Sequence, residues 1–263
     1  MENIWATATK PIIALAPMEG VTDSSFRQIC RERGADIAYT EFISSDAIGH
    51  SARRAFEKMA FDPAEQPVIC QIFGCNPEMF GLAAVEIEKR GFAGIDVNLG
   101  CPAKTVVKNG AGVALLRKPS YARELLARIV DKVNIPVSIK IRTKIRKERA
   151  EVAPGLEEWY TALDLLEALQ DIPLAAIMVH GRSFEQGHSG DIDAAMIRAV
   201  KERFTRGPVL ANGGIFTPER AKEVLSKQRK VLDAIAKSLM EVETLEQEAY
   251  EKIISSFNIA LKK

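Results

Sequence analysis

Seven short apolar runs that alternate with helical patterns constrain the fold of this chain more than any other feature. The runs are Ile12–Ala16, Ile37–Thr40, Val68–Phe73, Gly94–Asn98, Val137–Ile141, Ala176–Val179 and Val209–Ala211. The helical patterns between them are Asp23–Arg33, Glu78–Arg90, Tyr121–Val133, Leu156–Gln170, Ile192–Arg203 and Pro218–Leu225. Strands that are apolar along their whole length and alternate with helices indicate a parallel α/β sheet.

The number and spacing of these units favour one closed architecture. Seven strand–helix units within about 225 residues predict a (β/α)8 TIM-type barrel over residues 1–225. A doubly wound open sheet is the alternative, but no GxGxxG follows the first strand. Thr22-Asp23 and Thr217-Pro218 predict helix starts, because Thr caps open amides and Pro fits the first turn.

The C-terminal part departs from this repeat. No eighth strand–helix unit is evident after Leu225, and residues 226–263 are expected to form a helical tail. Leu232, Ile235 and Leu239 mark one apolar face, and a second helix is expected after Glu243-Thr244. We therefore expect a barrel that lacks its eighth unit.

Composition excludes several classes of protein. The 263 residues are 47% hydrophobic and 27% charged with a net charge of +1, so nucleic-acid binding would require a local patch. The four cysteines form no CxxC pair and no secretory leader is evident, which predicts reduced thiols, no metal site and a cytoplasmic protein. No apolar run approaches the roughly 20 residues of a membrane span, so we expect no membrane partner.

Polar residues gather where the predicted strands end, the edge at which α/β folds carry out chemistry. An amide, a lysine, a histidine and a glycine turn at one mouth suit a planar, electron-accepting ligand with a phosphate. Taken singly, each residue also has an explanation that involves no function. A lone Cys is usually buried and inert, and Lys140 could be a surface lysine. The strand-end segments are Pro17-Met18-Glu19, Gln71, Asn98 to Lys104 with Cys101, Lys140 with Arg142, His180 with Arg182, and Asn212-Gly213-Gly214.

Several of these segments together resemble the motifs of the tRNA-dihydrouridine synthases. The resemblance runs in order from about Ile12 to about Leu225. It rests on Pro17-Met18-Glu19-Gly20-Val21-Thr22-Asp23 with Phe26-Arg27, Gln71-Ile72-Phe73-Gly74, Asp96-Val97-Asn98-Leu99-Gly100-Cys101-Pro102, Lys108-Asn109-Gly110-Ala111-Gly112, Lys140-Ile141-Arg142-Thr143, His180-Gly181-Arg182 and Asn212-Gly213-Gly214-Ile215.

The resemblance implies an FMN enzyme that takes electrons from NADPH and reduces uridines in tRNA to 5,6-dihydrouridine. It implies that Cys101 is the proton donor, for which the protonated thiol is the useful form. Asn98 would bind the uracil, which must leave its stack, and Lys104, Arg142 and Arg182 would face the substrate. The implied cofactor residues are Pro17, Met18, Glu19, Gln71, Lys140, His180, Asn212, Gly213 and Gly214.

A basic run supports RNA binding independently of the resemblance. Six cations fall within the ten residues from Lys140 to Arg149, interrupted by one acid, Glu148. Such a run could contact phosphates, and a solvated loop is the alternative.

The family pattern ends before the chain does. The family's eighth strand with a Gly-Arg pair and its C-terminal helical domain are not evident. Leu232–Ile254 instead resembles the C-terminal end of FtsH-type metalloproteases, with generic amphipathic helices as the alternative; no HExxH or P-loop accompanies it. Because that Gly-Arg pair completes the phosphate site in the family, we expect weakened FMN binding. The competing functions are an impaired remnant that binds RNA or a partner, and an FMN reductase of free pyrimidines.

Overall fold

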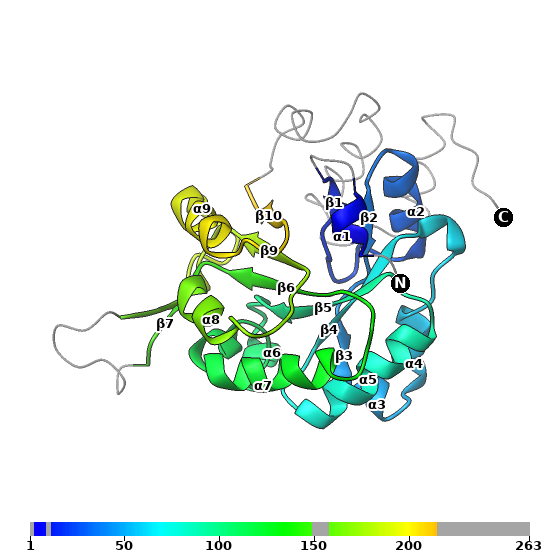
Figure 1. The fold of residues 1–263 in the computed structure, drawn as a ribbon, viewed down its shortest axis with the longest axis horizontal. Coiled ribbons are helices and arrows are strands. Elements are labelled where there is room, and N and C mark those ends of the chain that lie inside the picture. Colours follow the sequence, from blue (N-terminus) through cyan, green and yellow to red (C-terminus); the bar gives the residue numbers. More distant parts are fainter. Residues whose placement is uncertain (1–2, 9–11, 149–157, 215–263) are drawn as a thin grey trace.

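A parallel sheet wrapped by helices forms the body of the molecule (Figure 1). The computed structural model describes residues 3–8, 12–148 and 158–214, and all structural statements below refer to these. Their main sheet has eight strands in the order β1-β2-β4-β5-β6-β9-β10, with β3 paired to β4, and every pairing is parallel. The TIM-type barrel class expected from the sequence is confirmed.

All seven predicted strands are present, with ends that differ by at most two residues. They are β1 (Ala14–Leu15), β2 (Ile37–Tyr39), β4 (Val68–Phe73), β5 (Gly94–Leu99), β6 (Val137–Arg142), β9 (Ala176–His180) and β10 (Val209–Asn212). The predictions missed β3 (Ile43–Ser44) and the antiparallel hairpin of β7 (Lys144–Arg146) and β8 (Trp159–Thr161). These strands are too short to give a run of apolar residues.

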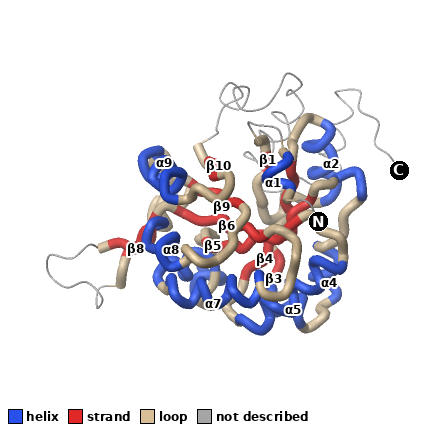
Figure 2. Tube along the Cα trace, viewed as in Figure 1, coloured by secondary structure: helices blue, strands red, loops and turns tan. Residues whose placement is uncertain are grey.

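The longer helices lie on the outside of the curved sheet (Figure 2). Those that correspond to predicted patterns are α2 (Ser24–Glu32), α5 (Pro77–Lys89), α7 (Pro119–Val130), α8 (Ala162–Ala168) and α9 (Ala194–Arg203). Shorter ones are α1 (Ile4–Thr7), α3 (Ser45–Gly49), α4 (Arg53–Lys58) and α6 (Lys104–Lys108), and 3-10 turns cover Pro63–Glu65 and Gly112–Arg117.

Two helix predictions need correction. The helix predicted from Leu156 begins only at Ala162, because Trp159–Thr161 pairs with β7 instead. Asp23, rather than Thr22, caps α2: its carboxylate accepts the Phe26 amide at 2.8 Å, while the Thr22 hydroxyl bonds to Met18. The helix start at Thr217-Pro218, the absence of an eighth unit, and the tail 226–263 with its FtsH resemblance lie outside the described residues.

The two faces of the strands bury different cores, which explains why the strands are mostly apolar. Alternate residues of β4 to β9 pack outward against the helices, whereas Trp5, Tyr39, Ile69 and Met178 fill the inside of the barrel. Towards the C-terminal ends of the strands the inner positions become polar. The registers place Asn98 beside Lys140 and Arg142 beside His180 at this end.

Candidate active site

The loop after β5 holds Cys101 through the side chain of Asn98. The Asn98 Oδ1 accepts the backbone amides of Gly100 at 3.1 Å and Cys101 at 2.8 Å. On its other side the Cys101 carbonyl accepts the Val113 amide at 3.2 Å. The loop is thus fixed from the strand below it and from the Gly112–Arg117 turn beside it.

The Cys101 thiol is partly buried and favours its protonated form. Burial raises the pKa of Cys101, an effect that the cations of Lys140 and Arg142 partly offset. A thiol with a raised pKa remains protonated at neutral pH and is able to donate its proton.

Arg142 ties together two loops at the barrel mouth. Its Nε donates to the Gly100 carbonyl at 2.9 Å, and its Nη1 donates to Ser183 at 2.8 Å and Gly187 at 2.7 Å. The side chain is 1% exposed. The sequence did not predict that Arg142 would brace the loops after β5 and β9. These hydrogen bonds do not test the RNA contact expected of Arg142.

His180 packs against the glycine turn that follows β10. Gly213 has φ +89°, and a Cβ there would lie 2.5 Å from the His180 ring. The Arg182 Nη1 lies 3.4 Å from the His180 Nε2. Burial, followed by the charges of Arg142, Lys140 and Arg182, lowers the pKa of His180 to about 3, so the imidazole is neutral at pH 7.

The mouth carries an excess of positive charge. Lys140 lies inside the barrel, where burial, partly offset by Asp96, lowers its pKa to about 8. Arg142 and Arg182 are almost fully buried nearby, and their charges act on the same histidine as Lys140 does. Three cations act on His180, which packs against the glycine turn, and their combined charge suits an anionic ligand.

The segment after β1 lies on the same rim. The Thr22 hydroxyl bonds to both the amide and the carbonyl of Met18, at 3.2 and 3.1 Å, and the Glu41 carboxylate accepts the Gly20 amide at 2.6 Å. Met18 and Glu19 are exposed, and Glu19 forms an ion pair with Lys58.

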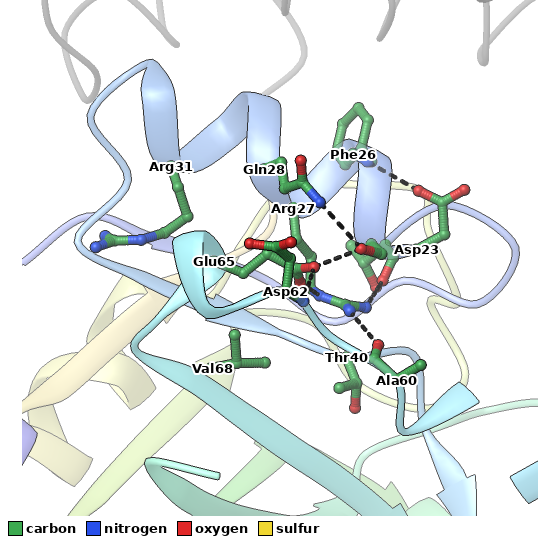
Figure 3. Close-up of polar contacts among 12 residues, drawn as sticks. Asp23, Phe26, Arg27, Gln28, Arg31, Thr40, Ala60, Asp62, Glu65 and Val68 are labelled. Atoms are coloured by element: carbon green, nitrogen blue, oxygen red, sulfur yellow. Dashed lines mark hydrogen bonds and ion pairs between the residues drawn. The ribbon is translucent and has the colours of Figure 1, made fainter. Parts of the chain in front are cut away.

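A buried ion pair anchors this segment to α2 (Figure 3). The Arg27 Nε donates to Glu65 at 2.5 Å, while its two Nη atoms donate to the carbonyls of Thr22 at 2.8 Å and Ala60 at 2.9 Å. Arg27 is 1% exposed and Glu65 is fully buried. The motif residue Arg27 therefore positions the Met18 segment rather than contacting a ligand.

The basic run is divided between two strands, so within the described residues it is not the solvated loop that was the alternative to RNA binding. Lys140 and Arg142 belong to β6 and face the barrel interior, whereas Lys144 and Arg146 belong to β7 and lie over the Trp159 ring at 4.6 and 5.0 Å. Strand pairing and cation–π contacts therefore divide it. Arg149 lies outside the described residues.

The remaining predicted residues also lie at or below the mouth. Gln71 is wholly buried between Asp96 and Asn98, and Lys104 is exposed at the start of α6. Pro17 and Asn212 are partly buried at their strand ends. His188, whose ring centroid lies 6.0 Å from that of His180, was not singled out in the sequence, because nothing in its loop marked it.

Metal-binding clusters and membrane-spanning helices are both absent from the described residues. Within residues 3–8, 12–148 and 158–214, no group of three or more His, Cys, Asp or Glu side chains could hold a metal ion. None of the helices in this part of the chain is long and apolar enough to cross a membrane.

Comparison with protein families decides the assignment. The family model described as dihydrouridine synthase (Dus) matches residues 14–234, which is more than half of the chain. The chain belongs to the dihydrouridine synthase family. The match includes β1 to β10 and the Cys101 loop.

Curated relatives agree with this family. A tRNA-dihydrouridine synthase B of Pseudomonas aeruginosa is 34% identical over 215 residues, covering 82% of this chain and 61% of the relative. One of Xanthomonas axonopodis pv. citri is 35% identical over 216 residues, with the same two coverages. The matched part of this chain thus spans about three-fifths of the length of these relatives.

Solved structures share the fold at low sequence identity. A histamine dehydrogenase from Rhizobium sp. 4-9 has a TM-score of 0.60 and 12% identity, covering 96% of this chain and 48% of that one. A variant of NCR from Zymomonas mobilis has a TM-score of 0.54 and 13% identity, covering 95% of this chain and 96% of that one. These likenesses support the barrel fold.

Proposed function

We propose that this protein reduces specific uridines of tRNA to 5,6-dihydrouridine with FMN as cofactor and NADPH as reductant. Family membership supports the reaction class. The single observation that carries the proposal is a protonated Cys101 thiol at the end of β5, held by Asn98 beside a cationic mouth. That arrangement supplies a proton donor next to an anion site.

The residues at the mouth fit FMN. Gly213 and Gly214, with φ +89° and +75°, form a left-handed turn that packs against His180 and Ile192, and the cations around His180 suit the charge of a phosphate. When bound, FMN supplies the hydride that the base receives at C6. The residues that would hold it are Pro17, Met18, Glu19, Gln71, Lys140, His180, Asn212, Gly213 and Gly214.

Lys140 and His180 would contribute differently to this site. Lys140 carries most of its positive charge at pH 7, because its pKa of about 8 lies above neutrality. It would favour a ring that gains negative charge on reduction. His180, neutral at pH 7, would contribute a hydrogen bond without adding a further charge.

Cys101 would donate a proton to C5 of the base as the hydride arrives at C6. Its thiol form is the active one, so activity should fall as the pH rises through its raised pKa. Cys101 would be regenerated as a thiol by taking a proton from solvent after each turnover.

Asn98 would bind the base as a donor. Its Oδ1 already accepts two backbone amides, and one of its amide hydrogens goes to Gln71. The remaining hydrogen would pair with a carbonyl oxygen of uracil. Lys104, which is exposed, would contact tRNA at the mouth, while Arg142 and Arg182 would contribute their charge to the tRNA side from buried positions. A tRNA substrate would place the protein in the cytoplasm.

The test uses the full chain with FMN, NADPH and either unmodified tRNA or free uracil. We expect FMN to bind and dihydrouridine to form in the tRNA, measured by mass spectrometry of its nucleosides. Reduction of uracil without reduction of tRNA would favour the free-pyrimidine reaction and contradict the proposal. FMN-loaded protein that reduces neither substrate, or protein that does not bind FMN, would also contradict it.

A further inference from the structure

A buried carboxylate below the mouth has no role in the reaction proposed above. Asp96 is wholly buried on the inner face of β5. In the sheet register it lies opposite Gln71 of β4 on one side and Ser138 of β6 on the other. Both neighbours donate hydrogen bonds to its carboxylate. The question is therefore which side chains this carboxylate orients.

Asp96 accepts one hydrogen bond on each oxygen. The Ser138 Oγ donates to its Oδ1 at 2.6 Å, and the Gln71 Nε2 donates to its Oδ2 at 2.7 Å. Burial raises the pKa of Asp96 to about 6, while both hydrogen bonds and Lys140 oppose that rise, so the group is mostly ionised at pH 7. An ionised carboxylate can only accept, and Gln71 must therefore turn its amide nitrogen towards it.

The bonds continue from Gln71 to the Cys101 loop. The Gln71 Oε1 accepts the Asn98 Nδ2 at 3.0 Å. The Asn98 Oδ1 in turn accepts the backbone amides of Gly100 and Cys101. A continuous line of hydrogen bonds thus joins the buried carboxylate to the loop that holds the thiol.

The two ends of this line fix the direction of every bond in it. A carboxylate at one end only accepts, and backbone amides at the other end only donate. If Gln71 turned over, its nitrogen would face the Asn98 nitrogen and its oxygen would face the Asp96 oxygen. Each amide therefore has one satisfied orientation.

We propose that Asp96 is a positioning residue, which orients the Gln71 and Asn98 amides and through them holds the Cys101 loop in place. Its effect on that loop stands independently of the reaction. Its effect on catalysis rests on the proposed function, because an oriented Asn98 offers a base only an N–H donor. A uracil carbonyl pairs with that donor, whereas the amino group of cytosine does not.

Three variants of the full chain without added FMN test the effect on the loop. Asp96→Leu keeps the branching of the side chain but leaves the Gln71 amide without an acceptor. Asp96→Asn keeps an acceptor for Gln71 and can donate to Ser138, so it should conserve the line. Ser138→Ala is the matched control, because it removes the other bond of Asp96 and leaves the Gln71 bond in place.

The measurement is the rate at which iodoacetamide alkylates Cys101, followed by mass spectrometry of its peptide. Asp96→Leu should raise this rate about fivefold, the factor that corresponds to one net hydrogen bond. Asp96→Asn and Ser138→Ala should stay within about twofold of wild type. An unchanged rate in Asp96→Leu, or an equal rise in Asp96→Asn, would overturn the proposal.

A charge relocation keeps the test decisive even where Asp96→Leu does not fold. Gln71→Glu places two carboxyl groups in contact, and at a pH high enough to ionise both it should raise the alkylation rate, because neither can then donate to the other. Combining Gln71→Glu with Asp96→Asn exchanges the amide and the carboxylate between the two positions. The amide introduced by Asp96→Asn then donates to the carboxylate introduced by Gln71→Glu, and that carboxylate still accepts from Asn98. The double variant should regain the wild-type rate within about twofold, and a double variant as fast as Gln71→Glu would overturn the proposal.

Dihydrouridine formation by the same variants separates the two claims. The alkylation pattern above supports the positioning role even if wild-type protein does not reduce tRNA, in which case only the proposed function fails. If wild type reduces tRNA and Asp96→Leu, with FMN bound, does so at the wild-type kcat/KM, the positioning role fails and the proposed function stands.

Discussion

Gly112 determines how closely the chain can pass behind the candidate proton donor. It has φ +60°, and a Cβ at this position would lie 2.8 Å from both the Cys101 carbonyl oxygen and the Val106 Cγ1. Gly110, two residues earlier, has φ +75° with nothing within 4 Å of such a Cβ. Gly112 therefore combines a left-handed backbone with close packing, whereas Gly110 has the left-handed backbone alone.

We predict that Gly112→Ala lowers the free energy of unfolding by about 2–4 kcal/mol, since overpacking adds to the left-handed strain. Gly110→Ala, which meets the strain alone, should cost about 1–2 kcal/mol. Urea unfolding of both variants measures the difference. Equal losses would show that the Cys101 loop yields to a methyl group and is not tightly packed there.

Sequence reasoning identified the residues at the mouth better than it identified their contacts. Cys101, Lys140 and His180 are predicted because they lie near or just beyond the C-terminal ends of apolar runs, and these strand ends do converge. Asp96 was a missed signal: a carboxylate inside an otherwise apolar run, two residues before Asn98 and so on the same face. The three backbone contacts of Arg142 could not be predicted, because they depend on loops distant in the sequence.

At the scale of elements, the Arg27–Glu65 ion pair joins α2, the Met18 segment and the Pro63–Glu65 turn. Glu65 also accepts the Asp62 amide at 2.8 Å and the Ser24 hydroxyl. A buried charge that loses its partner is costly, whereas loss of both charges is much less so.

We predict that Arg27→Met lowers the free energy of unfolding by about 3–5 kcal/mol and that Glu65→Leu has a similar effect. The double variant should be destabilised by less than the sum of the two, because neither charge is then left buried alone. Thermal and urea unfolding of the four proteins measure the coupling. Additive losses would mean that the two side chains act independently.

The strands were predictable and the hairpin was not, for a physical reason. A strand of the main sheet is buried on both faces, so most of its residues are apolar and the run is visible in the sequence. In the hairpin, Ile145 is buried between the exposed or half-exposed Lys144 and Arg146. Its basic residues therefore suggested a solvated loop, although they pack on Trp159.

At the scale of the whole molecule, burial of His180 in the cationic mouth makes the free energy of unfolding depend on pH. The pKa of His180 is about 3 in the folded protein, against about 6.5 in an unfolded chain. As the pH falls through this window the unfolded state takes up a proton that the folded state does not, so stability falls. Asp96 works in the opposite direction, because its folded pKa of about 6 is raised.

We predict that wild-type protein loses stability relative to His180→Asn as the pH falls from about 6.5, by about 1.4 kcal/mol per pH unit. Comparing the two proteins by urea unfolding isolates His180, because Asp96 is present in both. A difference between them that stays constant between about pH 7 and about pH 5 would mean that His180 titrates normally in the folded state.

The most direct test of the account is a single turnover of the flavin-loaded protein on unmodified tRNA, with wild type compared to Cys101→Ala. The flavin is first reduced by NADPH, and its reoxidation on mixing with tRNA is followed by absorbance. We predict reoxidation and dihydrouridine formation in wild type, and a rate about 10²- to 10⁴-fold lower in Cys101→Ala with FMN binding unchanged. Equal rates in the two proteins would contradict the assignment of Cys101 as the proton donor.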